Sequence, residues 1–147
     1  MPEINKDFIV DGPISSQMIS DVLNASTRLD IGAQSIFLGQ IRGDIINNQS
    51  VTGIEYSVYE EMIEPEMQKI ITTITGKYSD IQKIHILHSA GLVKVGEISL
   101  LVFVCCGHRA QAFKAVEEIV DLIKLRIPIW KKEFLEDDTH RWPENRL

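Results

Sequence analysis

The sequence predicts an α+β fold in which helices pack on a mixed or antiparallel sheet. Segments with apolar residues at helical spacing alternate with β-branched and aromatic segments, in the order helix, two strands, helix, two strands, helix, tail. The chain has 147 residues, of which 44% are hydrophobic. This length can bury one core, so we expect one domain over residues 1–147.

The first half of the chain predicts one helix and two strands. A serine pair at 15–16 can cap a helix that runs to about Arg28. Residues 33–42 are expected to form a strand, and the polar, turn-rich residues 43–50 a loop. The β-branched and aromatic residues of 51–59 predict a second strand.

The middle of the chain predicts a second helix followed by two further strands. Residues 60–78 have helical spacing; Pro65 fits only near the helix start, and Gly76 indicates its end. Residues 81–91 alternate as a strand does. Residues 97–106 are almost entirely apolar, which is typical of a central strand buried on both faces.

A third helix is expected from Arg109 to Arg126, and Pro128 prevents its continuation. Its apolar stripe is predicted to contain Phe113, Val116, Val120, Ile123 and Ile127, widened by Ala112 and Ile119. The tail, residues 134–147, is charged and contains aromatic side chains. We expect it to pack on the domain or on a partner.

Composition narrows the class of function. The net charge is −6 and the pI about 5.2, whereas nucleic-acid binding normally requires a basic face. The longest apolar run has nine residues, too few to span a membrane. The adjacent Cys105 and Cys106 lack the spacing of a zinc or redox pair and would point to opposite faces of a strand. We therefore expect core thiols in a reducing cytoplasm.

Three lysines lie around Pro128: Lys124 before it, and Lys131 and Lys132 after it. They are compatible with a solvated helix end, with an anion site or with catalytic amines. On a helical wheel Lys124 lies about 20° from Phe113, at the edge of the apolar stripe. For Lys124 alone, a solvated lysine near a helix C-terminus is the simpler interpretation.

Two other segments place cations at the ends of strands. His108 and Arg109 lie where the central strand turns into the third helix. The free backbone N–H groups at the start of a helix form a natural anion-binding site. Arg42 ends the strand at 33–42. If these residues converge with Lys124 and Lys131, the ligand should be a phosphate or another compact anion. The sequence has no phosphate-binding glycine loop, no nucleophile elbow and no zinc pattern, so we expect no metal and no cofactor.

Residues 95–133 resemble the large, catalytic subunit of molybdopterin synthase, the MoaE family. The matching residues are Gly96-Glu97, His108-Arg109, Ala112-Phe113, Lys124, Pro128, Trp130, Lys131, Lys132 and Glu133. Upstream, "FLGQIRG" and "GIEYSVYEEM" resemble two further segments of the family. The resemblance covers about residues 33 to 146 of the chain.

The resemblance implies an α/β-hammerhead fold with additional strands and a role in molybdenum cofactor biosynthesis. It implies sulfur transfer to cyclic pyranopterin monophosphate (precursor Z), which gives the dithiolene of molybdopterin. The sulfur would arrive as a thiocarboxylate on the C-terminal tail of a small ubiquitin-like sulfur-carrier subunit. Two large subunits would form a central homodimer. The alternative function is a non-catalytic receptor for such a tail.

The resemblance also implies roles for individual residues. Lys124 and Lys131 match the catalytic lysines of the family. The other matching positions are expected to bind substrate: Gln40, Ile41, Arg42, His108, Arg109, Lys132, Glu133 and, in the tail, Arg146.

Overall fold

The computed structural model describes residues 2–26 and 28–143, which form three helices and a nine-stranded sheet. Six strands follow one another in the order β3-β7-β6-β5-β8-β9. The ladders along this path are antiparallel, whereas two short N-terminal strands pair with β6 in parallel. The predicted α+β class with a mixed sheet is confirmed.

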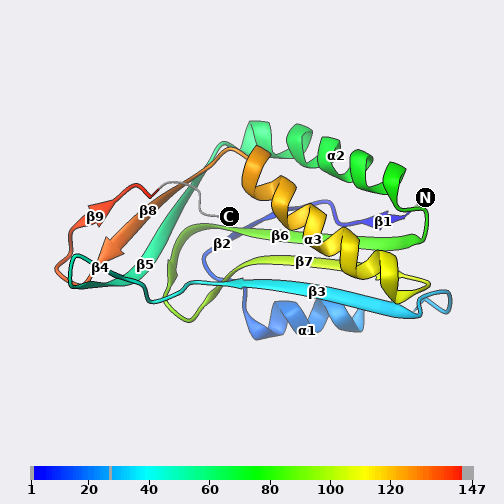
Figure 1. Ribbon diagram of the computed structural model, residues 1–147, viewed down its shortest axis with the longest axis horizontal. Coiled ribbons are helices and arrows are strands. Elements are labelled where there is room, and N and C mark those ends of the chain that lie inside the picture. Colours follow the sequence, from blue (N-terminus) through cyan, green and yellow to red (C-terminus); the bar gives the residue numbers. More distant parts are fainter. Residues whose placement is uncertain (1, 27, 144–147) are drawn as a thin grey trace.

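The first half of the sheet is covered on both faces. It comprises β3 (Ala33–Gln40), β7 (Ile98–Cys106) and β6 (Ile81–Lys94). Helices α2 (Glu60–Lys77) and α3 (Arg109–Arg126) lie on one face, and α1 (Ser16–Asn24) lies on the other, as Figure 1 shows. Alternate residues of β7 therefore belong to two separate clusters, and every residue from 99 to 106 is buried.

The two cysteines follow this alternation. Cys105 packs in the cluster under α1, and Cys106 packs in the cluster under α2 and α3. Both thiols are free and buried, as predicted for core residues on opposite faces of a strand.

The second half of the sheet extends beyond the helices. It contains β5 (Gln49–Val58), β8 (Ile129–Leu135) and β9 (His140–Arg141). Strand β6 joins the two halves, because it pairs with β7 up to His88 and with β5 from Gly91 onward. Gly91 has a φ of +86°, a conformation that glycine adopts without strain. In Figure 1 this half forms one end of the molecule.

Three further short strands, β1, β2 and β4, complete the sheet at its margins. Strands β1 (Glu3–Ile4) and β2 (Ile9–Asp11) lie parallel to β6, and β9 pairs with β8. Strand β4 (Ile45–Ile46) forms a hairpin with β5. Asn47 and Asn48 at its tip have φ values of 51° and 63°, as a tight hairpin turn requires.

Several predictions need correction. Helix α1 ends at Asn24 instead of about Arg28, and α2 continues through Gly76 to Lys77. Residues 43–50 contain β4 and are not simply a loop. Residues 129–135, for which the sequence predicts no element, form strand β8. The bounds of α3 and the Ser15 cap, whose hydroxyl accepts a hydrogen bond from the Met18 N–H, are confirmed.

The apolar face of α3 is as predicted except at Phe113, because the other predicted members are all buried, namely Ala112, Val116, Ile119, Val120, Ile123 and Ile127. Phe113 is 64% exposed, whereas Ala112, Ala115, Ile119 and Ile123 face the core. Phe113 therefore does not belong to the buried stripe.

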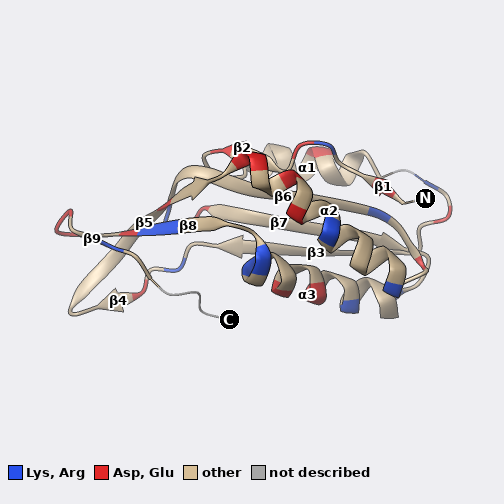
Figure 2. Ribbon diagram, turned by 90° about the horizontal axis from the view of Figure 1, so that it is seen from above, with Lys and Arg blue, Asp and Glu red and all other residues tan. Residues whose placement is uncertain are grey.

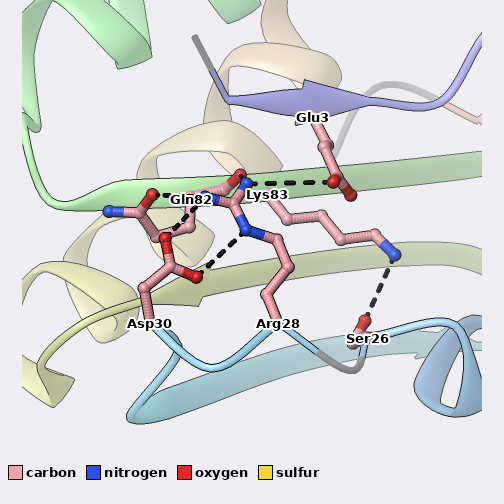
Figure 3. A network of polar contacts seen from close by, with 6 residues as sticks. All are labelled: Glu3, Ser26, Arg28, Asp30, Gln82 and Lys83. Atoms are coloured by element: carbon pink, nitrogen blue, oxygen red, sulfur yellow. Dashed lines mark hydrogen bonds and ion pairs between the residues drawn. The ribbon is translucent and has the colours of Figure 1, made fainter.

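A polar network ties the segment after α1 to β6 (Figure 3). The Arg28 guanidinium donates to both carboxylate oxygens of Asp30, at 3.0 and 2.6 Å, and to the backbone carbonyl and side chain of Gln82. The ammonium of Lys83 donates to the Ser26 hydroxyl at 3.2 Å. These contacts fix the entry to β3.

In the described part of the chain, no helix is long and apolar enough to cross a membrane.

Candidate functional site

A cavity of about 300 Å³ opens where the two halves of the sheet meet. Six elements, namely β3, β5, β6, β7, α3 and β8, contribute its walls, together with residues from three segments outside them. The lining residues are Phe37, Gly39, Gln40, Ile41, Arg42, Asp44, Ile54, Tyr56, His88, Ser99, Leu100, Ile123, Lys124, Ile127, Ile129, Lys131, Glu133 and Pro143.

The end of β3 brings the first cation to this cavity. The β3–β7 register shifts between Gly39 and Gln40, so the chain leaves the ladder there. Ile41 is buried, and its backbone pairs with the turn after β6 through bonds to Glu97 O and Gly96 N at 3.0 and 2.9 Å. Arg42 follows at the rim. Its side chain is 79% exposed and lies 2.6 Å from a carboxylate oxygen of Asp44.

The Gly96-Glu97 pair has a structural role in the same turn. Gly96 has a φ of +88°, in the region that favours glycine. The Glu97 carboxylate accepts a hydrogen bond from the Lys94 N–H at 2.8 Å. The turn therefore holds the backbone that places Gln40, Ile41 and Arg42.

The C-terminal end of α3 supplies the second cation. Ile123 and Ile127 are buried, and Lys124 between them is half-buried at the cavity wall. This agrees with the predicted position of Lys124 at the edge of the apolar face. Pro128 ends the helix, and the chain enters β8 immediately.

Strand β8 supplies the third cation through its pairing with β5. Lys131 lies opposite Tyr56, and Glu133 lies opposite Ile54. Residues directly opposite one another in an antiparallel pair share a face, and here that face is the cavity wall. Glu133 is buried and forms an ion pair with Arg141 of β9 at 2.6 Å.

Lys132 and Trp130 occupy the other face of β8, because side chains alternate along a strand. The Lys132 ammonium lies 5.4 Å from the centre of the Phe134 ring. Trp130 is 49% exposed and packs edge-on against Tyr59, with ring centroids 5.1 Å apart. Trp130 is therefore only partly buried, and Lys132 does not line the cavity.

A buried polar group that was not predicted to belong to the site lines the cavity near the lysines. His88 lies edge-on to Tyr56, with ring centroids 5.0 Å apart. The Tyr56 hydroxyl donates a hydrogen bond to the Ser99 hydroxyl at 3.1 Å, and burial raises the pKa of Tyr56. Burial is also the main reason why the pKa of His88 falls to about 4, and the charges of Lys131 and Lys124 lower it further.

His108 and Arg109 lie at the opposite end of α3 from Lys124, about 20 Å away along the helix axis at 1.5 Å per residue. The His108 backbone N–H donates to the Asp80 carboxylate at 2.7 Å, so an internal anion already lies at this helix start. The His108 side chain is 90% exposed. Within one chain, these two residues do not converge with Arg42, Lys124 and Lys131. Arg146 lies outside the described residues.

The site thus contains members that sequence reasoning missed, namely Asp44, Tyr56, His88 and Ser99. The signal available for His88 was its place on the same strand face as Ile84 and Ile86, both fully buried. A histidine at the end of a buried face needs a polar environment. Among the described residues no group of three or more His, Cys, Asp or Glu side chains could hold a metal ion.

Comparison with known proteins places the chain in a family. Residues 9–126 match the family model described as "MoaE protein". The chain is 44% identical over 116 residues to a molybdopterin synthase catalytic subunit from Dictyostelium discoideum. That match covers 78% of this chain and 73% of the Dictyostelium protein. It is 38% identical over 137 residues to the protein of the same name from Drosophila willistoni. That match covers 88% of this chain but only 37% of the longer Drosophila protein.

Solved structures agree with this assignment. The crystal structure of molybdopterin synthase from Staphylococcus aureus superposes with a TM-score of 0.82 at 28% identity, covering 93% of this chain and 96% of that one. A complex of subunits 1 and 2 of the molybdopterin-converting factor from Helicobacter pylori has the same fold, with a TM-score of 0.78 at 20% identity, over 95% and 90% of the two chains. The family model, the relatives and the shared fold together show that the chain belongs to the MoaE family.

Proposed function

We propose that this protein is the catalytic subunit of a molybdopterin synthase. It would act as a sulfurtransferase that converts cyclic pyranopterin monophosphate (precursor Z) to the dithiolene of molybdopterin. The observation that carries this proposal is the convergence of Lys124 from α3 and Lys131 from β8 on one cavity. Both lysines stand in the segment whose pattern resembles the family's catalytic motif.

The cavity suits an anionic substrate. Arg42, Lys124 and Lys131 bring three cationic side chains to its wall, and cations stabilise both a phosphate and the charge that develops as a ring is opened. Apolar side chains such as Ile123, Ile127 and Ile129 form much of the remaining wall. They exclude water and so strengthen each electrostatic contact.

We assign different tasks to the two lysines. Lys124, half-buried between Ile123 and Ile127, is the acid–base group for the proton transfers that accompany sulfur addition. Lys131 holds the incoming thiocarboxylate or the phosphate, since its strand position fixes it opposite Tyr56. Gln40 and Ile41 shape the wall beside Arg42, and Glu133 holds β8 in register through its ion pair with Arg141.

The sulfur donor in this proposal is the C-terminal thiocarboxylate of a small ubiquitin-like subunit. The Helicobacter pylori complex contains two subunits of the corresponding factor, and a tail that ends in an anion matches the charge of this cavity. We also propose a central homodimer. Because His108 and Arg109 lie about 20 Å along α3 from Lys124, they can bind a ligand in this cavity only from a second copy of the chain.

We also propose a cytoplasmic location, because free, buried thiols such as Cys105 and Cys106 are typical of proteins in a reducing compartment.

Reconstitution tests the proposal. The purified chain is mixed with precursor Z and a thiocarboxylated small subunit, and the dithiolene product is quantified. Product that depends on both the thiocarboxylate and this chain would support the assignment. Tight binding of the small subunit with no product would instead favour the alternative, a non-catalytic receptor for a ubiquitin-like tail.

A further inference from the structure

The proposed function gives no task to His88, although this histidine lies in the wall of the cavity. His88 is 7% exposed and stands on β6, close to the point where this strand changes partner from β7 to β5. A buried polar ring that only filled space would be costly compared with an apolar side chain. Its surroundings therefore indicate what it does.

The hydrogen bonds of His88 define which ring nitrogen carries the proton. Nδ1 lies 2.7 Å from the backbone carbonyl oxygen of Ser89. A carbonyl can only accept, so Nδ1 must carry the hydrogen. The pKa of His88 is lowered to about 4 by burial, against the opposing effect of the Ser89 bond and with help from Lys131 and Lys124. At neutral pH the ring is uncharged, and Nε2 holds a lone pair.

That lone pair is an uncharged hydrogen-bond acceptor among charged side chains. The charged and titratable groups around His88 are Lys131 and Glu133 on β8, Lys124 on α3, Arg42 and Asp44 after β3, and Tyr56 on β5. The nearby carboxylates already have cationic partners, Glu133 in Arg141 and Asp44 in Arg42. The Tyr56 hydroxyl donates to Ser99.

An uncharged acceptor has a specific advantage here. A carboxylate beside a lysine would orient the ammonium but cancel its charge, and so weaken the attraction for an anionic ligand. A neutral imidazole nitrogen accepts one ammonium hydrogen and leaves the positive charge in place. Lys131 is the candidate donor, because it lies opposite Tyr56, against whose ring His88 packs edge-on, and both Lys131 and His88 line the cavity.

We propose that His88 is a positioning residue of this cavity, whose unprotonated Nε2 accepts a hydrogen bond from the Lys131 ammonium and directs its remaining hydrogens toward a bound anion. The task in turnover rests on the proposed function. The geometry and the protonation state of His88 do not depend on it and can be tested separately.

Two amide substitutions separate positioning from a structural role. In His88→Gln the side-chain oxygen can take the place of Nε2, and the donor to the Ser89 carbonyl is lost. In His88→Asn the amide N–H can replace Nδ1–H, and the acceptor at Nε2 is lost. We expect His88→Asn to lower kcat/KM roughly tenfold or more, the size of a hydrogen bond to a charged group, while His88→Gln stays within a few-fold of the parent.

The reverse order, with Asn active and Gln impaired, would show that only the bond to Ser89 matters and would overturn the proposal. His85 provides the matched control. It is on the same strand three residues earlier, does not line the cavity, and its pKa is likewise lowered to about 4, mainly by burial. His85→Asn and His85→Gln should leave kcat/KM unchanged.

Nitrogen NMR of the full chain, labelled at histidine, tests the inference without any turnover. We expect His88 to be the neutral Nδ1–H tautomer at pH 7, and its pKa to rise in Lys131→Ala and less in Lys124→Ala. An Nε2–H tautomer, or a pKa that Lys131→Ala leaves unchanged, would refute the contact. If the parent chain proves inactive in sulfur transfer but shows the expected NMR behaviour, the proposed function fails and the His88–Lys131 contact survives.

Discussion

The two ends of α3 carry similar residues but have different surroundings. His108 and Arg109 begin the helix at the surface, where the Asp80 carboxylate binds the His108 N–H. Lys124 near the other end is half-buried and shares a cavity with Lys131 and Arg42. Figure 2 shows Lys and Arg at the C-terminal end of α3 and on the neighbouring strand β8. Cations at a helix end therefore form a concave site only where a second element, here β8, closes over them.

The largest effect should come from removing the amine at the cavity end. Lys124→Ala is expected to reduce product formation at least about 100-fold, the usual contribution of a positioned acid–base group, with little change in thermal stability. Lys114→Ala, an exposed lysine on the same helix, is the control and should keep parental activity. Near-normal turnover by Lys124→Ala in the reconstituted assay would remove Lys124 from its proposed role.

Acidification should destabilise the cavity end through His88. Its pKa is about 4 in the folded chain and 6.5 in its ordinary state, so the unfolded chain binds the proton first as the pH falls. The corresponding stability is present above pH 6.5 and is lost between pH 6.5 and 4, by up to about 3 kcal/mol. His85 adds a smaller share in the same direction, since it is less buried.

Urea unfolding at pH 7.5 and 4.5 measures this loss. His88→Gln should show a shallower fall in the free energy of unfolding than the parent chain. If the free energy of unfolding falls equally in the two proteins between pH 7.5 and 4.5, His88 is not held neutral in the folded state.

Mixing two impaired variants tests whether the two ends of α3 meet across a dimer. Arg109→Ala alone should lower kcat/KM roughly tenfold, the loss of a hydrogen bond to a charged group. If Arg109 serves the cavity of a second copy, a mixed dimer of Arg109→Ala and Lys124→Ala chains contains one intact site. Activity should then recover partly after the two variants are mixed and allowed to exchange. No recovery, with subunit exchange verified, would place Arg109 outside the site.

The smallest expected effect is the change in the free energy of unfolding when an exposed apolar side chain is removed from the middle of α3. Phe113 is 64% exposed, so Phe113→Ala should change the free energy of unfolding of the isolated chain by no more than about 0.5 kcal/mol. Ile119→Ala, at a fully buried position of the same helix, should cost about 2–5 kcal/mol. Chemical denaturation of both variants measures the contrast, and similar losses would mean that the buried face of α3 includes Phe113.

The sequence predicts α3 correctly at both ends because strong local signals bound it, namely Gly107 before it and Pro128 after it. The central strand β7 was equally clear, since an unbroken apolar run has few alternatives. Phe113 was misplaced because hydrophobicity alone cannot say how far a helix is rotated on its sheet. The N-terminal strands have two and three residues, too few to show a periodic pattern.

The candidate site was only partly predictable for a related reason. Lys124 could be placed at the edge of an apolar face from helical geometry alone. Lys131 could not, because the helix ends between the two lysines and β8 pairs with β5, a strand distant in the sequence. The charged residues of β8 concealed its strand character, and no local pattern reports a partner so far along the chain. The family resemblance predicted that Lys124 and Lys131 share a site. The register of β5 and β8 explains how Lys131 reaches it.

Because side chains alternate along β8, that register decides which of its residues face the cavity. A strand that slips by one residue turns every side chain to the other face, so the deletion of a single residue between Pro128 and Lys131 would exchange the two faces of β8 relative to β5. Lys132 would then take the position of Lys131, and an amine would still face the cavity. Phe134 would take the position of Glu133 in the cavity wall, and Glu133 would turn to the outer face together with Arg141, its partner across the β8–β9 hairpin. The adjacent lysines thus keep an amine at the cavity in either register, whereas the buried carboxylate of Glu133 lines the cavity only in the observed one.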